Sequence, residues 1–180
     1  GVNDLAAASG QSVNQPVYVI LHIDNENLNA INRNRVLNQT RSFIDETLVT
    51  PVQMMVVSSR RSLAIRQAFT DDSEAVLGAL QRVAHESGAR IARERERRRI
   101  FAAMERWAND ARRLSFIALI GTVNAQVFMA QMQGEIWAYA EEESGVLRDT
   151  LANMREVVRL LTGLEGRRAI VYVSNGLPMT

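Results

Sequence analysis

The sequence predicts an α/β fold built on a mostly parallel sheet. Three short, largely apolar runs support this prediction: 17–23, 52–58 and 169–173. A strand that is covered on both faces loses the polar alternation of a half-exposed strand, and such strands are typical of parallel sheets. Segments with apolar residues at helical spacing separate the runs, and this alternation is expected of an α/β protein.

The first strand leads into a turn and a helix. Asp24 follows the strand directly, and the Asn-rich stretch 25–34 suits a turn and a helix cap. Apolar residues then recur at helical spacing over 36–48. This amphipathic helix must end before Pro51, because the residue that precedes a proline avoids helical backbone.

The third strand, 63–69, is less apolar than the second, and we expect it at an edge of the sheet. The connection 58–62 is short enough for a hairpin, which makes the second and third strands antiparallel. Asp71 and Glu74 have the spacing of a capping box, so the next helix is predicted to begin near Ser73.

A long helical region follows. We expect its first helix to continue through His85 into 93–99, where seven consecutive residues are charged. Seven helical residues rise about 10 Å and place charge on every face, so this segment should stand off the body of the protein. Its charges form a ladder at four-residue spacing, made of Glu86, Arg90, Glu94 and Arg98.

A second long helix is predicted over about 125–161. Gly134 and Gly145 each cost about 1 kcal/mol relative to alanine, which makes both positions candidates for a kink or a break. Gly163 or Gly166 is a natural stop at the C-terminal end.

The net charge of +1 conceals an uneven distribution. Residues 81–120 hold ten arginines and five acidic residues, whereas the blocks on either side each have a balance of −2. All 21 basic residues are arginines. If the two long helices fold back on each other near 115–123, the arginines of 93–99 lie level with the glutamates of 141–143. Arginine suits this pairing because its guanidinium meets a carboxylate in a bidentate fork.

Composition excludes several classes of protein. The chain has no cysteine, which excludes a disulfide scaffold, a thiolate metal site and a cysteine nucleophile. It has no phosphate-binding glycine motif, and glutamates interrupt the arginines of 93–99, so no nucleic-acid partner is expected. His22 and His85 have no serine or cysteine at motif spacing, and we interpret them as satisfied or solvated side chains rather than catalytic ones.

No signal peptide is visible in these residues, and no transmembrane helix is expected. No apolar run approaches the length of a membrane span. Residues 1–16 have neither a positively charged start nor an apolar core, so they are interpreted as a linker or an edge introduced by cloning.

Three stretches carry a family resemblance: 17–28 (VYVILHIDNENL), 54–79 and 137–179, the last with AYAEEESGVLRDTL and LTGLEGRRAIVYVSNGLPM. They resemble the von Willebrand factor A-type domain, and more closely its bacterial "VWFA-related" group. The resemblance implies a doubly wound α/β sheet over 17–180, mostly parallel with one antiparallel edge strand, and a helical insert at about 85–145. It also implies that the fourth strand lies beside the first with a bare outer edge, and that the domain is incomplete at its C-terminus.

The resemblance further implies a degenerate metal site at the strand ends. The family's metal-ion-dependent adhesion site combines a D-x-S-x-S loop, a threonine and a later aspartate around a hard cation. Asp24 matches the first aspartate, Glu26 and Leu28 replace the serines, and Asn175 replaces the later aspartate. Asp24, Glu26 and Asn175 would then hold Mg²⁺ or Ca²⁺. The alternative, in which no cofactor is bound, is that Asp24 and Asn175 cap and orient loops. The threonine is not placed, since Thr122 lies in a stretch that does not align.

Together these features indicate a non-enzymatic protein-interaction or adhesion-type module. A protein partner would bind at the strand ends around Asp24 and Asn175, or through the insert. The alternative is a structural protein that forms homo-oligomers through the insert, with the sheet as a scaffold. The apolar stretch 116–132 at the tip of the helical hairpin would be a partner site or ordinary core. The residues assign no compartment, and the resemblance alone implies a secreted or periplasmic location.

Overall fold

The computed structural model describes residues 15–86, 90–114 and 122–176. Its sheet contains β1 (Val17–Asp24), β2 (Val52–Ser59), β3 (Leu63–Thr70) and β4 (Arg167–Val173), in the order β3-β2-β1-β4. β1 pairs in parallel with β2 and with β4, whereas β3 is antiparallel to β2. The predicted α/β class is therefore confirmed, together with the antiparallel edge strand and the placement of the fourth strand beside the first.

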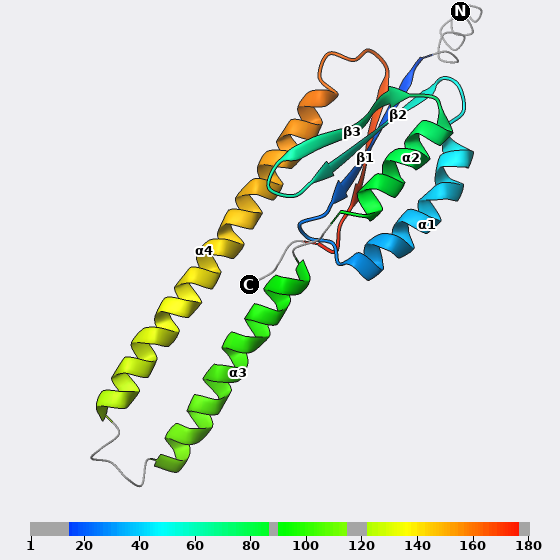
Figure 1. Ribbon diagram of the computed structural model, residues 1–180. Coiled ribbons are helices and arrows are strands. Elements are labelled where there is room, and N and C mark those ends of the chain that lie inside the picture. Colours follow the sequence, from blue (N-terminus) through cyan, green and yellow to red (C-terminus); the bar gives the residue numbers. More distant parts are fainter. Residues whose placement is uncertain (1–14, 87–89, 115–121, 177–180) are drawn as a thin grey trace, which may run out of the picture.

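Helices cover both faces of the sheet (Figure 1). α1 (Ala30–Thr47) and α2 (Ser73–Ala84) lie on one face, and α4 (Thr122–Leu160) lies on the other. Successive side chains of a strand point to opposite faces. In β1, Val19, Leu21 and Ile23 therefore join the core beneath α1 and α2, while Ile20 joins the core beneath α4. Apolar residues on both faces explain why the strand shows no polar alternation.

The helix starts follow local capping chemistry. The side chain of Asn29, in the Asn-rich stretch, caps α1 by accepting the N–H of Asn32 at 2.7 Å. α2 begins at Ser73 as predicted, but its cap is Asp72, whose carboxylate accepts the N–H of Glu74 at 2.9 Å. The capping box assigned to Asp71 was wrong by one residue, because the residue directly before the first helical position provides the cap.

The helix predicted to run on from α2 is interrupted before α3 (Arg90–Leu114). His85 is the C-cap of α2, and Glu86 lies outside both helices. Glu86 contacts Asn25 at 2.6 Å and Arg66 at 2.7 Å instead. The predicted charge ladder therefore loses its first member, because these partners hold Glu86 against the body of the protein.

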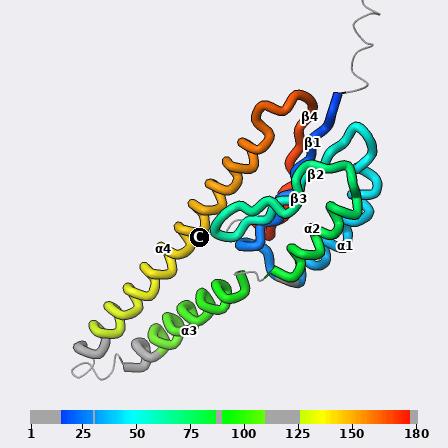
Figure 2. The backbone as a smooth tube through the Cα atoms, turned by 45° about the horizontal axis from the view of Figure 1, so that its top comes forward, coloured from blue at the N-terminus to red at the C-terminus, as the bar shows by residue number. Residues whose placement is uncertain are grey.

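α3 and α4 project from the sheet as an antiparallel pair (Figures 1 and 2). α4 is continuous over 39 residues, so the kink or break considered at Gly134 and Gly145 does not occur. Met132 lies near Gly134 in sequence and Val146 lies next to Gly145, and both are buried. Burial of such neighbours offsets the cost of about 1 kcal/mol that each helical glycine carries. The predicted fold-back near 115–123 lies largely outside the described residues.

β4 is less buried than predicted. Its first four residues are exposed and its last three are half-buried, because it is an edge strand with no outer neighbour among the described residues. This matches the expected bare edge and corrects the expectation of a fully buried strand. None of the described helices is long and apolar enough to cross a membrane.

Candidate functional site

The C-terminal ends of β1, β2 and β4 meet at one edge of the sheet, where the loop after β1 lies. The polar residues 24–27 of this loop are buried: Asp24 is 1% exposed and Asn27 is 0% exposed. The loop folds back onto Asp24, whose backbone oxygen accepts the N–H of Leu28 at 3.0 Å and whose Oδ1 accepts the N–H of Asn27 at 3.2 Å. Since buried polar groups need hydrogen-bond partners, Asp24 fixes the shape of this loop.

The second carboxylate oxygen of Asp24 accepts three donors. They are the Asn27 amide at 2.8 Å, the Ser174 hydroxyl at 3.3 Å and the Tyr172 hydroxyl. Burial raises the pKa of the Tyr172 hydroxyl, and its hydrogen bond to Asp24 raises that pKa further. Tyr172 thus stays protonated and donates a hydrogen bond to Asp24, which joins the end of β4 to the end of β1.

Glu26 lies against a buried arginine from the helical insert. Arg93 is 8% exposed, and its Nη1 lies 3.3 Å from Glu26 Oε1. Its Nη2 donates to the Glu26 backbone oxygen at 2.6 Å and to Asn27 Oδ1 at 3.3 Å, and its Nε lies 3.8 Å from Glu143 Oε1. On its solvent side, Glu26 lies 3.7 Å from the exposed Arg60. The guanidinium of Arg93 thus joins the strand-end loop to both long helices.

These contacts refine the predicted pairing of the basic and acidic blocks. Arg93 meets Glu143, and Arg99 meets Glu135 at 3.2 Å. Glu141, by contrast, pairs with Arg148 of its own helix at 2.6 Å. The expectation that all of 93–99 stands off the body is wrong at Arg93, because a buried arginine is tolerated where carboxylate and carbonyl oxygens surround it.

Asn175 lies at the same sheet edge, just after β4, and is half-buried. With Leu28 and Ser174 it lines a cavity of about 490 Å³ beside α1. The structure therefore places all three predicted metal-site residues at one edge. Asp24 and Glu26 occupy the loop after β1, and Asn175 belongs to the cavity next to it.

As arranged, these side chains do not fit a hard cation. Mg²⁺ and Ca²⁺ need several oxygen ligands that are free to coordinate. The Oδ2 atom of Asp24 already accepts three donors, and the carboxylate of Glu26 lies between two guanidiniums. Within residues 15–86, 90–114 and 122–176, no group of three or more His, Cys, Asp or Glu side chains could hold a metal ion.

Several residues of this site carry no sequence signal. Thr150, 2% exposed on α4, accepts the Asn27 amide at 3.1 Å and so joins the loop to the second long helix. The threonine brought to the site is therefore Thr150, whereas the side chain of Thr122 lies outside the described residues. Arg93 and Tyr172 also reach the site from parts of the chain that are distant in sequence. Of these residues, only Asn27 could have been identified from the sequence, because it lies in the loop that follows a buried strand.

His22 lies within the sheet next to this site and is 1% exposed. Its Nε2 is 2.8 Å from Ser59 Oγ, and its ring centroid is 5.1 Å from that of Tyr172. Burial lowers the pKa of His22, an effect that Asp24 opposes. The predicted satisfied histidine is confirmed here, with Ser59 as its partner.

The distal part of the α3–α4 hairpin carries an apolar groove. Inside the hairpin, Trp107 stacks on Phe128, with centroids 5.7 Å apart and rings inclined by 10°. Beside this stack lies a groove of about 370 Å³, whose lining includes Phe101, Met104, Phe128, Met129 and Ile136. Phe101 is 59% exposed and Met129 is 46% exposed. Residues 116–121 of the predicted apolar tip lie outside the described residues.

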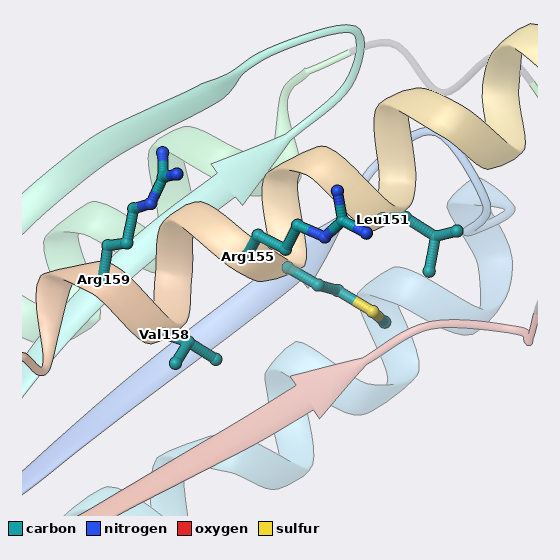
Figure 3. Close-up of a pocket in the computed structure, with 5 residues that line it drawn as sticks. Leu151, Arg155, Val158 and Arg159 are labelled. Carbon is teal, nitrogen blue, oxygen red and sulfur yellow. The ribbon is translucent and has the colours of Figure 1, made fainter.

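A second apolar surface lies on α4, nearer the sheet. Leu151, Met154 and Val158 line a hollow of about 420 Å³ together with the stems of Arg155 and Arg159. Figure 3 shows Leu151, Arg155, Val158 and Arg159 along this stretch of α4, with Val158 turned away from the guanidinium of Arg159. Val158 is 57% exposed and Leu151 is 44% exposed. α4 thus presents apolar side chains along much of its length.

No protein-family model and no curated protein matches the chain. Among solved structures, it is similar to three N-terminal domains of the type V pili tip protein Mfa5 from Porphyromonas gingivalis, at 18% identity over 37% of this chain and 13% of that one, with a TM-score of 0.34. It is also similar to the vWF domain of the same protein, at 19% identity over 39% of this chain and 27% of that one, with a TM-score of 0.35. The match thus spans less than a third of either solved chain. The strand order and strand directions described above agree with the von Willebrand A-like sheet that the sequence resemblance implies.

Proposed function

We propose that this chain is a non-enzymatic protein-interaction module whose binding surface is the groove of the α3–α4 hairpin. The exposed apolar side chains that line this groove carry the proposal. Exposed apolar patches of this kind on a protein surface mark partner sites. Methionines such as Met104 and Met129 have flexible side chains that adapt readily to a bound surface. The strand-end site is the poorer candidate for a binding surface, because its carboxylates already have partners within the chain.

The charges around the groove indicate the chemistry of the partner. α3 holds nine arginines and four acidic residues, whereas α4 holds three arginines and six acidic residues. The exposed Arg97 and Arg98 lie one helical turn before Phe101, on the same side of α3. A helix with an apolar stripe and acidic neighbours would therefore complement the groove, in the helix-in-groove mode of recognition.

The α4 helix of a second copy has this chemistry. It exposes Met129, Ile136 and Leu147, and the exposed Glu141 and Glu142 lie among them in sequence. We therefore assign the groove to a second copy, with α3 of each chain beside α4 of the other. The adhesion-type role and the secreted or periplasmic location implied by the resemblance stay predictions.

Sedimentation velocity over a range of concentrations tests this assignment. We expect a dimer that dissociates on dilution and weakens in high salt, because exposed charge pairs are screened. Met129→Glu should abolish the dimer by placing a charge in the groove. Val127→Glu is the matched control, since Val127 is 62% exposed on the same helix but does not line the groove.

Trp107 supplies a second measurement. Replacing Trp137 by phenylalanine leaves Trp107 as the single tryptophan, and its emission should shift to the blue as the groove fills. A chain that stays monomeric excludes the second copy as occupant. A synthetic acidic amphipathic helix then tests a different protein partner through the same emission. If neither concentration nor this peptide moves the Trp107 emission, the groove is not the binding surface.

A further inference from the structure

Six exposed apolar side chains lie on one side of α4. They are separated by seven, four, seven, four and seven residues: Met129, Ile136, Ala140, Leu147, Leu151 and Val158. Four residues make slightly more than one helical turn and seven make slightly less than two, so two successive intervals complete about three turns. The six side chains therefore form one stripe, the α4 stripe, which runs along the helix for roughly 40 Å.

The α4 stripe joins the two apolar surfaces described above. Met129 and Ile136 line the groove of the hairpin. Leu151 and Val158 line the hollow nearer the sheet. The intervals of the stripe are the same when they are counted in either direction along the chain. A second α4 that runs antiparallel to the first can therefore match every position of the stripe, in the facing pairs Met129 with Val158, Ile136 with Leu151, and Ala140 with Leu147.

We propose that the α4 stripe is an interface between two copies of this chain, in which the α4 helices pack antiparallel about a twofold axis between residues 143 and 144. The groove of each copy then receives Leu151 and Val158 of the other copy. The hollow of each copy receives Met129 and Ile136. Both copies use the same surface, which is the usual arrangement of a symmetric dimer. The inference rests on the proposed function, which it deepens by fixing the direction and the register of the second copy.

The charges of α4 favour the antiparallel direction. Residues 122–143 hold four glutamates and no arginine, whereas residues 144–160 hold three arginines, one aspartate and one glutamate. Antiparallel helices bring the acidic half of each copy beside the half that carries the arginines. Parallel helices place the two acidic halves together, and like charges at close range repel each other.

Trp137 and Arg148 provide a further contact between the copies. Each follows a residue of the α4 stripe directly, so both lie along the same edge of the stripe, and Trp137 is 74% exposed. In this register Arg148 faces position 139 of the second copy, with Trp137 and Glu141 of that copy two residues to either side. An arginine over a tryptophan ring is a favourable cation–π contact. The ion pair of Arg148 with Glu141 in its own chain is exposed, and such pairs are weak enough to exchange partners.

Disulfide trapping tests the direction and the register, since the chain has no cysteine of its own. One chain carries Ala140→Cys, and a second chain, made longer by a tag, carries Leu147→Cys. A disulfide needs Cα atoms within about 7 Å of each other, so the mixture should form a cross-linked heterodimer in a mild oxidant. Neither variant should cross-link with itself, because positions 140 of the two copies lie about 10 Å apart along the helices.

Ala138→Cys and Asp149→Cys form the matched control pair. Each position lies two residues from a position of the α4 stripe, and side chains two residues apart do not face the same way on a helix. The mixture of these two variants should therefore not cross-link. Cross-linking of Ala140→Cys with itself would indicate parallel helices and would overturn the proposal.

Leu151→Glu distinguishes this inference from the proposed function. Leu151 lines the hollow but not the groove, so a dimer that meets only at the groove tolerates this change. In the antiparallel register the change should raise the dissociation constant of the dimer at least about tenfold in sedimentation velocity, because it buries a charge. Ala152→Glu, at the next exposed position, is the control and should leave the dimer unchanged. A dimer that persists with Leu151→Glu overturns the register alone, and a wild-type chain that stays monomeric overturns the second copy as well.

Discussion

His22 should make the folding stability of this protein depend on pH below neutrality. It is 1% exposed, and burial lowers its pKa below the ordinary value of 6.5. The unfolded chain therefore takes up a proton near pH 6.5, while the folded chain does not. Because the unfolded state then binds more protons, the free energy of unfolding falls as the pH falls. Above pH 6.5 both states are neutral at this residue, and the effect disappears.

The magnitude follows from the linkage relation. Below the unfolded pKa, the free energy of unfolding falls by about 1.4 kcal/mol per pH unit until the pKa of the folded state is reached. The assay is urea unfolding across this pH range in a His85→Gln background, where His22 is the only histidine. The comparison chain also carries His22→Gln, which keeps a polar side chain at this position but does not titrate.

The difference between the two chains isolates His22, because carboxylates contribute equally to both. We expect the chain that retains His22 to lose stability more steeply below pH 6.5, and the two curves to run parallel above it. Identical slopes in both chains would show that His22 is not held neutral by burial. A gain of stability with acid in the His22 chain would contradict the reasoning outright.

Local backbone features give further expectations. Asp72→Ala should lower the free energy of unfolding by about 1 kcal/mol, because it removes the cap of α2. Asp71→Ala, the control, should change the free energy of unfolding by less than about 0.5 kcal/mol. The midpoints of urea unfolding of the two variants measure this difference. Gly166→Ala should lower the melting temperature sharply, because Gly166 has a φ of +128° and an added Cβ would lie 2.2 Å from the Pro16 oxygen. Gly134→Ala meets nothing within 4 Å and should stabilise α4 by up to about 1 kcal/mol; an unchanged or lower melting temperature would contradict this.

Local signals predicted most of the sheet. The apolar runs of β1 and β2 and the short connection from β2 to β3 suffice for two buried strands and a hairpin, since burial pattern and loop length are properties of adjacent residues. The start of α2 at Ser73 is equally local. The interruption between α2 and α3 was not predicted. At its start, Glu86 contacts Asn25 and Arg66, which lie on other elements, and the sequence near Glu86 does not announce these contacts.

The candidate site was predicted only in part. The place of Asp24 after a buried parallel strand identifies the sheet edge where ligands bind. Nothing near Asp24 in sequence announces Arg93, Thr150 or Tyr172, which come from α3, α4 and β4. Their side chains determine which charges and hydrogen bonds Asp24 and its loop experience. A motif comparison at positions 24, 26, 28 and 175 therefore cannot describe the site.

By itself, the sequence determined the α/β class, the buried strands and the presence of a long helical region with opposite charges at its two ends. These properties depend on hydrophobic periodicity and on charge counts, which a linear chain displays directly. The tertiary structure alone decided which arginine meets which carboxylate. Burial and distance set the strength of an ion pair, and both arise only when distant segments come together. For that reason Arg93, one of seven consecutive charged residues, becomes the buried cation at the strand ends, while its neighbours Arg95 and Arg97 remain in solvent.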